Sequence, residues 1–157
     1  MRIGHGYDAH RFCEGDSLVL GGVRIPFEKA FLAHSDGDVL IHALIDALFG
    51  AAGEPDIGAH FPPSDDRYRG IDSTLLLAET VRILMEKGFR LEYADMTIVA
   101  ERPKMAPYLG AMRERIAEVL GVPVSRINVK ATTEEKMGFT GRGEGISAHA
   151  VCLLREV

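Results

Sequence analysis

The segment from Asp38 to Ala51 is the part of this sequence that most constrains the fold. Its apolar residues fall on nearly every side of a helix, which predicts a buried helix that begins after an N-cap at Asp38. Only Asp38, His42 and Asp46 form a polar stripe along it, at a spacing of four residues. Because buried polar groups need partners, this stripe has to face other polar groups.

A polar pair near the N-terminus is a candidate partner for that stripe. Residues 1–13 are predicted to form a strand, on which Asp8 and His10 would point from one face. Together with His42 they offer one carboxylate and two imidazoles, which leave the fourth position of a tetrahedral zinc open, as a catalytic zinc requires. Asp38 or Asp46 would then orient the His42 ring. The alternative is that Asp8 and His10 lie on the strand surface and that His42 is a hydrogen-bonded core histidine.

Composition indicates one globular domain over residues 1–157, with 46% hydrophobic residues and a net charge of -5. The negative charge disfavours nucleic acid or an anionic membrane as a partner. Cys13 and Cys152 form no metal-binding or disulfide pattern, so reduced thiols are expected. The sequence has no secretory leader and no long apolar run, which favours a cytoplasmic enzyme.

Sequence patterns also predict the remaining elements. We expect a hairpin over 17–26 that turns at Gly21 and Gly22, a loop over 53–72, a helix from Asp72 to Lys87, a strand over 94–100, a helix over 107–120, and strands over 127–132 and 145–155. This order predicts an α+β domain, in which helices pack on one face of a mixed β-sheet.

Three loops contain residues suited to anion or nucleotide binding. The segment from His34 to Asp38 is either a turn with a helix cap or a substrate loop in which His34 donates to phosphate. Four glycines between Gly138 and Gly145 are either a flexible turn or an anion cradle that Arg142 completes. The segment from Pro103 to Pro107 is either a helix lead-in or a stiff loop whose main-chain atoms recognise a base edge.

No Ser-His-Asp or activated-cysteine arrangement indicates covalent catalysis. The candidate groups are instead those that phosphoryl transfer uses. They are the metal ligands, a second metal-competent carboxylate at Glu135, the hydroxyls of Thr132 and Thr133, and the guanidinium of Arg142.

Over essentially its whole length, the sequence resembles the 2-C-methyl-D-erythritol 2,4-cyclodiphosphate synthase family of the non-mevalonate isoprenoid pathway. The motifs that carry the resemblance are Arg2-Ile-Gly-His-Gly-Tyr-Asp-Ala-His10, His34-Ser-Asp-Gly-Asp38, Asp56-Ile-Gly58, Lys130-Ala-Thr-Thr133 and Gly138-Phe-Thr-Gly-Arg-Gly-Glu-Gly145.

The resemblance implies a lyase that converts 4-diphosphocytidyl-2-C-methyl-D-erythritol 2-phosphate to the cyclodiphosphate and releases CMP. It implies a homotrimer with active sites between subunits, zinc on Asp8, His10 and His42, and a second ion, magnesium or manganese, on the diphosphate and Glu135. His34 and Thr133 match positions that stabilise the transition state. The rival functions are a general zinc-dependent phosphohydrolase and a non-catalytic module in which zinc only ties strand to helix.

The same resemblance implies the substrate contacts. Residues implied to bind the cytidine half are Ala100, Pro103, Lys104, Met105, Ala106 and Thr132, while Asp56, Gly58 and the Phe61–Asp65 loop hold the methylerythritol half. Further substrate residues are Asp8, His10, His34, Ser35, Ile57, Phe61, Ser64, Asp65, Ala131, Thr133, Phe139 and Arg142.

Some positions depart from the family pattern. Pro63-Ser64 stands where Asp-Thr is frequent, Tyr7 replaces a frequent Phe and Glu134 a frequent Thr. In some relatives the positions of Tyr7, Phe139, Arg142 and Glu144 line a channel on the trimer axis that takes an isoprenoid diphosphate. Arg142 favours such a ligand here.

Overall fold

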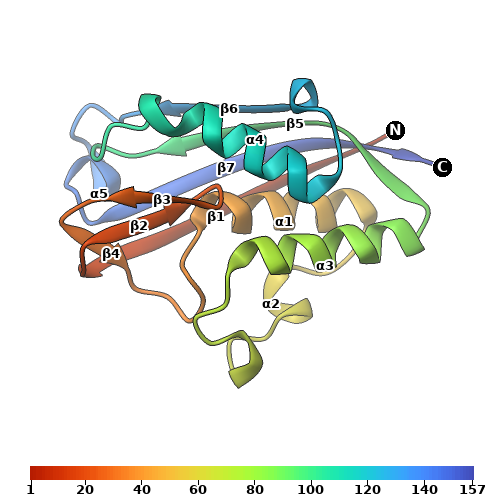
Figure 1. Cartoon of the computed structure of the whole chain (residues 1–157), viewed down its shortest axis with the longest axis horizontal. Helices are drawn as coiled ribbons and strands as arrows, with labels where there is room; N and C mark the ends of the chain where they lie inside the picture. The colour runs from red at the N-terminus through yellow and green to blue at the C-terminus, as the bar shows by residue number, and fades with distance from the viewer.

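The computed structural model describes residues 1–157. Its main sheet has five strands in the order β4-β1-β7-β5-β6, and only β5 and β6 run parallel, so the sheet is mixed. The strands are β1 (Arg2–Glu14), β4 (Lys29–Phe31), β5 (Phe89–Val99), β6 (Ile127–Thr132) and β7 (Gly145–Glu156). The helices α1 (Val39–Ala52), α3 (Ser73–Glu86) and α4 (Leu109–Leu120) cover one face of this sheet (Figure 1).

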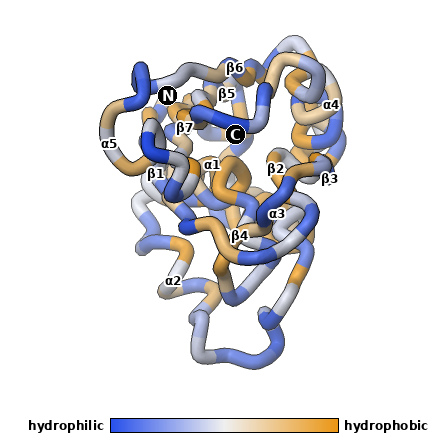
Figure 2. The backbone as a smooth tube through the Cα atoms, turned by 90° about the vertical axis from the view of Figure 1, so that its left-hand side faces the viewer, coloured by the Kyte–Doolittle hydropathy of each residue, from blue (hydrophilic) through white to orange (hydrophobic).

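Helix α1 lies at the centre of the molecule, between the sheet and α3, as the end-on view in Figure 2 shows. All of its residues except Asp46, Gly50 and Ala52 are buried, as its apolar pattern predicts. Asp38 caps the helix by accepting a hydrogen bond from the backbone N–H of Ile41 at 3.0 Å. Its carboxylate also accepts from the N–H groups of Gly21 and Gly22, and so ties the turn at these two glycines to α1.

Two glycines of β1 allow this strand to lie directly against α1. A Cβ atom added to Gly4 would lie 1.9 Å from the carbonyl oxygen of Ala47, and one added to Gly6 would lie 1.8 Å from that of Ala43. Only glycine therefore permits this separation of strand and helix. Asp8 and His10 follow on the same face of the strand, two and four residues after Gly6.

None of these three helices packs on the opposite face of the sheet. Tyr7 on β1, Tyr93 on β5 and Val151 on β7 expose 45%, 41% and 41% of their surface there. The prediction that the helices lie on one face is therefore confirmed.

Several boundaries differ from the sequence predictions. Strand β5 begins at Phe89 rather than at residue 94, and β4 was not predicted. The hairpin of β2 (Ser17–Leu20) and β3 (Val23–Pro26) has the expected turn but forms a separate two-stranded sheet. Short strands such as β4 depend on tertiary pairing more than on local pattern, which explains why the sequence does not reveal it.

Segments expected to be loops contain short helices. The region 53–72 holds α2 (Ile57–His60) and the 3₁₀ turn η1 (Asp66–Tyr68), and the glycine-rich segment holds α5 (Gly138–Gly141). Two more 3₁₀ turns, η2 (Ala106–Tyr108) and η3 (Val124–Arg126), lie on either side of α4. Cys13 and Cys152 are free thiols. None of the helices has the length and hydrophobicity that crossing a membrane requires.

Candidate metal centre

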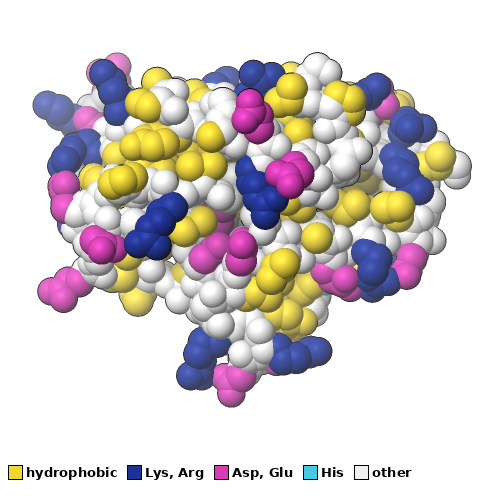
Figure 3. Space-filling view, viewed as in Figure 1, with side chains coloured by type: hydrophobic (Ala, Val, Ile, Leu, Met, Phe, Trp, Pro, Cys, Tyr) yellow, Lys and Arg dark blue, Asp and Glu magenta, His cyan; other side chains and the backbone are white.

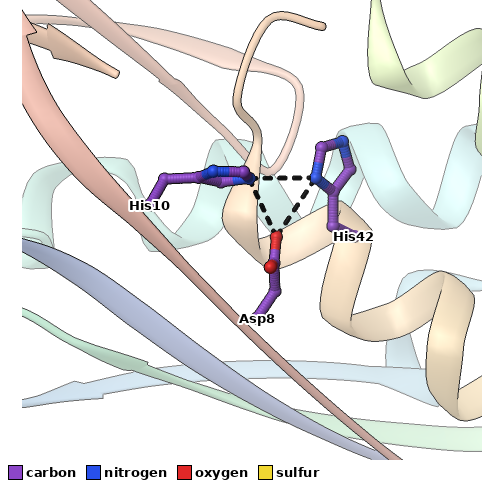
Figure 4. Close-up of side chains that lie close together, drawn as sticks. All are labelled: Asp8, His10 and His42. Atoms are coloured by element: carbon purple, nitrogen blue, oxygen red, sulfur yellow. Dashed lines mark hydrogen bonds and ion pairs between the residues drawn. The ribbon is translucent and has the colours of Figure 1, made fainter. Parts of the chain in front are cut away.

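Asp8 and His10 on β1 converge with His42 on the first turns of α1 (Figure 4). Oδ2 of Asp8 lies 3.0 Å from Nε2 of His10 and 3.1 Å from Nδ1 of His42. The two imidazole nitrogens are 3.2 Å apart. Zinc–ligand bonds of about 2.0–2.1 Å in tetrahedral geometry place ligand atoms roughly 3.3 Å from one another. The three donor atoms therefore fit a tetrahedral divalent ion that keeps one open position.

The site is electrostatically arranged for a cation. Burial favours the neutral carboxyl of Asp8, but hydrogen bonds and charge interactions with His10 and His42 outweigh burial and lower its pKa to about 2. Burial disfavours the charged ring of His42, yet the hydrogen bond and negative charge of Asp8, with the charges of Asp38 and Asp36, raise its pKa. The surrounding carboxylates thus stabilise positive charge at the point where the ligands meet.

The second ring nitrogen of His42 is held by hydroxyl groups. Its Nε2 lies 2.8 Å from Oγ of Ser73 and 3.2 Å from Oγ of Ser35. The Ser73 hydroxyl donates to Oδ1 of Asp36 at 2.5 Å, so its oxygen is left to accept the Nε2 proton of His42. This arrangement leaves the lone pair on Nδ1, the nitrogen that faces Asp8 and His10.

The prediction that Asp38 or Asp46 orients His42 is therefore wrong. The Asp38 carboxylate is occupied by backbone N–H groups, and Asp46 accepts from the N–H of Ile57 at 2.8 Å. Sequence reasoning missed Ser73 because a serine next to Asp72 is typical of a helix cap, which this pair also forms.

We expect Ser73→Ala to lower zinc affinity by about 10–100-fold without unfolding the protein, because the His42 ring loses its anchor. Competition with a chromogenic chelator measures this affinity. Thr80→Ala is the matched control, since it also removes a buried hydroxyl of α3, one that donates only to the carbonyl of Leu76. Equal zinc affinity in the Ser73 and Thr80 variants would contradict this role for Ser73.

Zinc affinity is also expected to fall with decreasing pH. The raised pKa of His42 means that its ring takes up a proton above pH 6.5, the ordinary value, and a protonated ring does not bind zinc. In the metal-free protein the charged His42–Asp8 pair stabilises the fold below this pKa, and that contribution is lost as the pH rises through it. Zinc titrations between pH 8 and pH 5.5 test this, and a constant apparent affinity would be the contrary result.

A cavity of about 260 Å³ adjoins the three ligands. Besides Asp8 and His10, its lining includes five further predicted substrate residues, namely His34, Ser35, Ile57, Gly58 and Phe61. Nε2 of His34 lies 3.1 Å from the backbone carbonyl oxygen of Asp65, so the 61–65 loop closes over His34. The cavity wall also includes Tyr68 and Leu76, which sequence reasoning missed because neither belongs to a polar motif.

The remaining predicted site residues lie outside this cavity. Ala131 and Thr132 end β6, and Thr133 and Glu135 follow in an exposed turn, where Glu135 has a φ of 55°. Residues 100–106 follow the neighbouring end of β5. Phe139 lines a separate hollow of about 290 Å³ with Tyr7 and Glu144, and the Nε of Arg142 donates to Glu144 at 2.7 Å. Within one chain, Glu135 is therefore not part of the Asp8–His10–His42 group.

The fold and this donor set define an α+β protein with a candidate divalent-metal site beside a cavity. The model of the YgbB family matches residues 1–155, and the chain belongs to this family. It is 61% identical to 2-C-methyl-D-erythritol 2,4-cyclodiphosphate synthase of Pseudomonas putida (strain W619), over 98% of each chain.

Solved structures agree with this relationship. A 2C-methyl-D-erythritol-2,4-cyclodiphosphate synthase in a CDP-bound form superposes with a TM-score of 0.90 at 39% identity, covering 98% of this chain and 100% of that one. The CDP complex of IspF from Plasmodium falciparum gives a TM-score of 0.86 at 34% identity, covering 99% of this chain and 96% of that one.

Proposed function

We propose that this protein converts 4-diphosphocytidyl-2-C-methyl-D-erythritol 2-phosphate to 2-C-methyl-D-erythritol 2,4-cyclodiphosphate and CMP. It is then a phosphorus–oxygen lyase of non-mevalonate isoprenoid synthesis. The observation that carries the proposal is the cluster of Asp8, His10 and His42 beside the cavity, in a chain that is 61% identical to a synthase of this name.

The reaction needs little acid–base chemistry from the protein. An oxygen of the 2-phosphate forms a bond to the β-phosphorus, and the bond from that phosphorus to the bridging oxygen of CMP breaks, so CMP leaves with the electron pair. Because the nucleophile is already anionic, no strong general base is required. The tether between the nucleophile and its target makes the attack unimolecular, for which effective molarities reach about 10⁵ M or more.

The residues of the site provide position and positive charge. Zinc held by Asp8, His10 and His42 would neutralise phosphate charge when bound. His34 would donate a hydrogen bond to the developing negative charge from the cavity side. The hydroxyl of Thr133 would donate a hydrogen bond from the other half of the site. A second ion, magnesium or manganese, on the diphosphate and Glu135 would reduce the repulsion between phosphates.

A homotrimer with shared active sites accounts for two features of the single chain. The cavity contains residues predicted for the methylerythritol half, whereas Ala100, the 103–106 segment and the 131–135 segment lie elsewhere on the same chain. The sheet face opposite α1, α3 and α4 exposes Ile3, Tyr7, Tyr93 and Val151, which neighbouring subunits would cover. Each site would then combine the cavity of one subunit with the cytidine-binding segments of the next.

An isoprenoid diphosphate on the trimer axis is a further part of this proposal. The hollow beside Tyr7, Phe139 and Glu144 offers an apolar wall, and Arg142, which pairs with Glu144, offers a guanidinium. A cytoplasmic location stays a prediction from the sequence.

Incubation of the zinc-loaded protein with the cytidyl substrate tests the function. The synthase produces CMP and the cyclodiphosphate in equal amounts and no inorganic phosphate. A general zinc-dependent phosphohydrolase, which would share the same three ligands, releases inorganic phosphate instead. Phosphate release without cyclodiphosphate would overturn the proposal.

A further inference from the structure

A cavity larger than the one beside the ligands lies away from the metal centre. It is a groove of about 530 Å³ between α3, the end of α4 and the start of β5, a volume typical of small-molecule sites. Its floor is apolar, with Leu48, Leu84, Phe89 and Leu120 all buried. None of its lining residues belongs to the proposed catalytic site.

Three arginines from three separate elements surround this floor. They are Arg90 on β5, Arg126 at the end of η3 and Arg155 on β7. Figure 3 shows dark-blue basic side chains gathered at the right-hand end of the molecule, next to yellow apolar ones. Arg90 and Arg155 are direct cross-strand partners, an arrangement that is unfavourable for like charges.

One carboxylate pairs with two of the three guanidiniums. Glu92 lies 2.6 Å from Arg126 and 3.3 Å from Arg155, and it sits where the register of β5 and β7 shifts. Arg90 has no acidic partner and donates only to the backbone carbonyl of Phe89.

Nearby acids on the flanking elements pair with other cations. Glu156 pairs with Arg2, and Glu86 pairs with Arg82. The three arginines of the groove and the single carboxylate of Glu92 leave a local charge of +2, in a chain whose net charge is -5.

We propose that this groove binds a phosphate monoester that carries an aliphatic chain. A phosphate monoester has a charge of about -1.5 to -2 at neutral pH, which matches the excess charge of the three arginines. Guanidinium groups bind phosphate oxygens through paired hydrogen bonds, and the apolar floor would take the hydrocarbon chain. The anion would also relieve the repulsion between Arg90 and Arg155. This inference does not depend on the proposed function.

The test is calorimetric titration of the zinc-loaded full chain with dodecyl phosphate, kept below its micelle concentration. We expect saturable binding at one site per chain and a rise in Tm. Butyl phosphate and inorganic phosphate should each bind at least tenfold more weakly, because they lack the chain that fills the groove. Dodecanol, which lacks the anion, should also bind at least tenfold more weakly.

The double variant Arg90→Gln/Arg155→Gln should fold, since it removes an unfavourable pair, and should bind dodecyl phosphate at least tenfold more weakly. Arg24→Gln/Arg82→Gln is the matched control, with the same loss of charge at exposed arginines outside the groove. Undiminished binding by the double variant, or equal binding of dodecanol or inorganic phosphate by the unaltered chain, would overturn the proposal.

Sedimentation with vesicles separates two sources of the same ligand chemistry. Vesicles that contain phosphatidic acid are compared with vesicles of phosphatidylcholine alone. If the unaltered chain binds phosphatidic acid vesicles and the double variant does not, the phosphate belongs to a membrane lipid. If the unaltered chain binds free dodecyl phosphate but not the vesicles, the phosphate belongs to a soluble amphiphile. Binding in neither assay contradicts the proposal.

Discussion

His42→Ala is expected to give a folded protein that has lost its zinc and about 10³-fold or more of its synthase activity. The change removes one of three metal ligands, and with it the charge neutralisation on which the proposed chemistry depends. The fold should survive because α1 keeps its Asp38 cap and its apolar contacts on all sides.

Circular dichroism, zinc content and CMP formation measure the three parts of this result. His149→Ala is the control, since it removes an exposed histidine outside the ligand group and should leave zinc content unchanged. If His42→Ala instead unfolds, zinc acts as a structural tie between β1 and α1, and the catalytic assignment is wrong.

Gly6→Ala is expected to have the largest effect on stability. The new methyl group would lie 1.8 Å from the carbonyl oxygen of Ala43, so β1 and α1 must separate. Overpacking of a core costs about 1–3 kcal/mol and sometimes more, and a clash between two backbone segments belongs at the upper end. The separation would also move His42 away from Asp8 and His10, so zinc affinity should fall together with stability.

Gly50→Ala provides a matched control on the same pair of elements. A Cβ atom at Gly50 meets only the carbonyl oxygen of His5, at 3.9 Å, and alanine is preferred in a helix by up to about 1 kcal/mol. Urea denaturation should therefore show a stability equal to or above that of the unaltered chain. Similar unfolding midpoints for the Gly6 and Gly50 variants would show that the close contact of β1 and α1 does not determine stability.

The sequence predicts those features of the fold that depend on local periodicity. The nearly continuous apolar character of 39–51 predicts a buried helix, and Asp38 and Asp72 mark the helix starts that the structure has. The polar stripe on α1 and the Asp8–His10 pair together predict the convergence that the structure confirms.

Other features arise only from tertiary contacts. Ser73 orients His42 because Asp36, 37 residues earlier in the chain, takes its hydroxyl proton, and no local pattern reveals that contact. The three arginines of the groove meet because the start of β5, η3 and the end of β7 lie on the same side of the molecule. The pairing of Arg90 with Arg155 depends on a strand register that the sequence does not specify.

Zinc titration of chelator-stripped protein tests the central claim most directly, with CMP formation as the readout and magnesium in excess. If Asp8, His10 and His42 hold one catalytic zinc, CMP formation rises in proportion to added zinc and stops rising at one zinc per chain. Full CMP formation by protein that contains no zinc or other transition metal would contradict the claim.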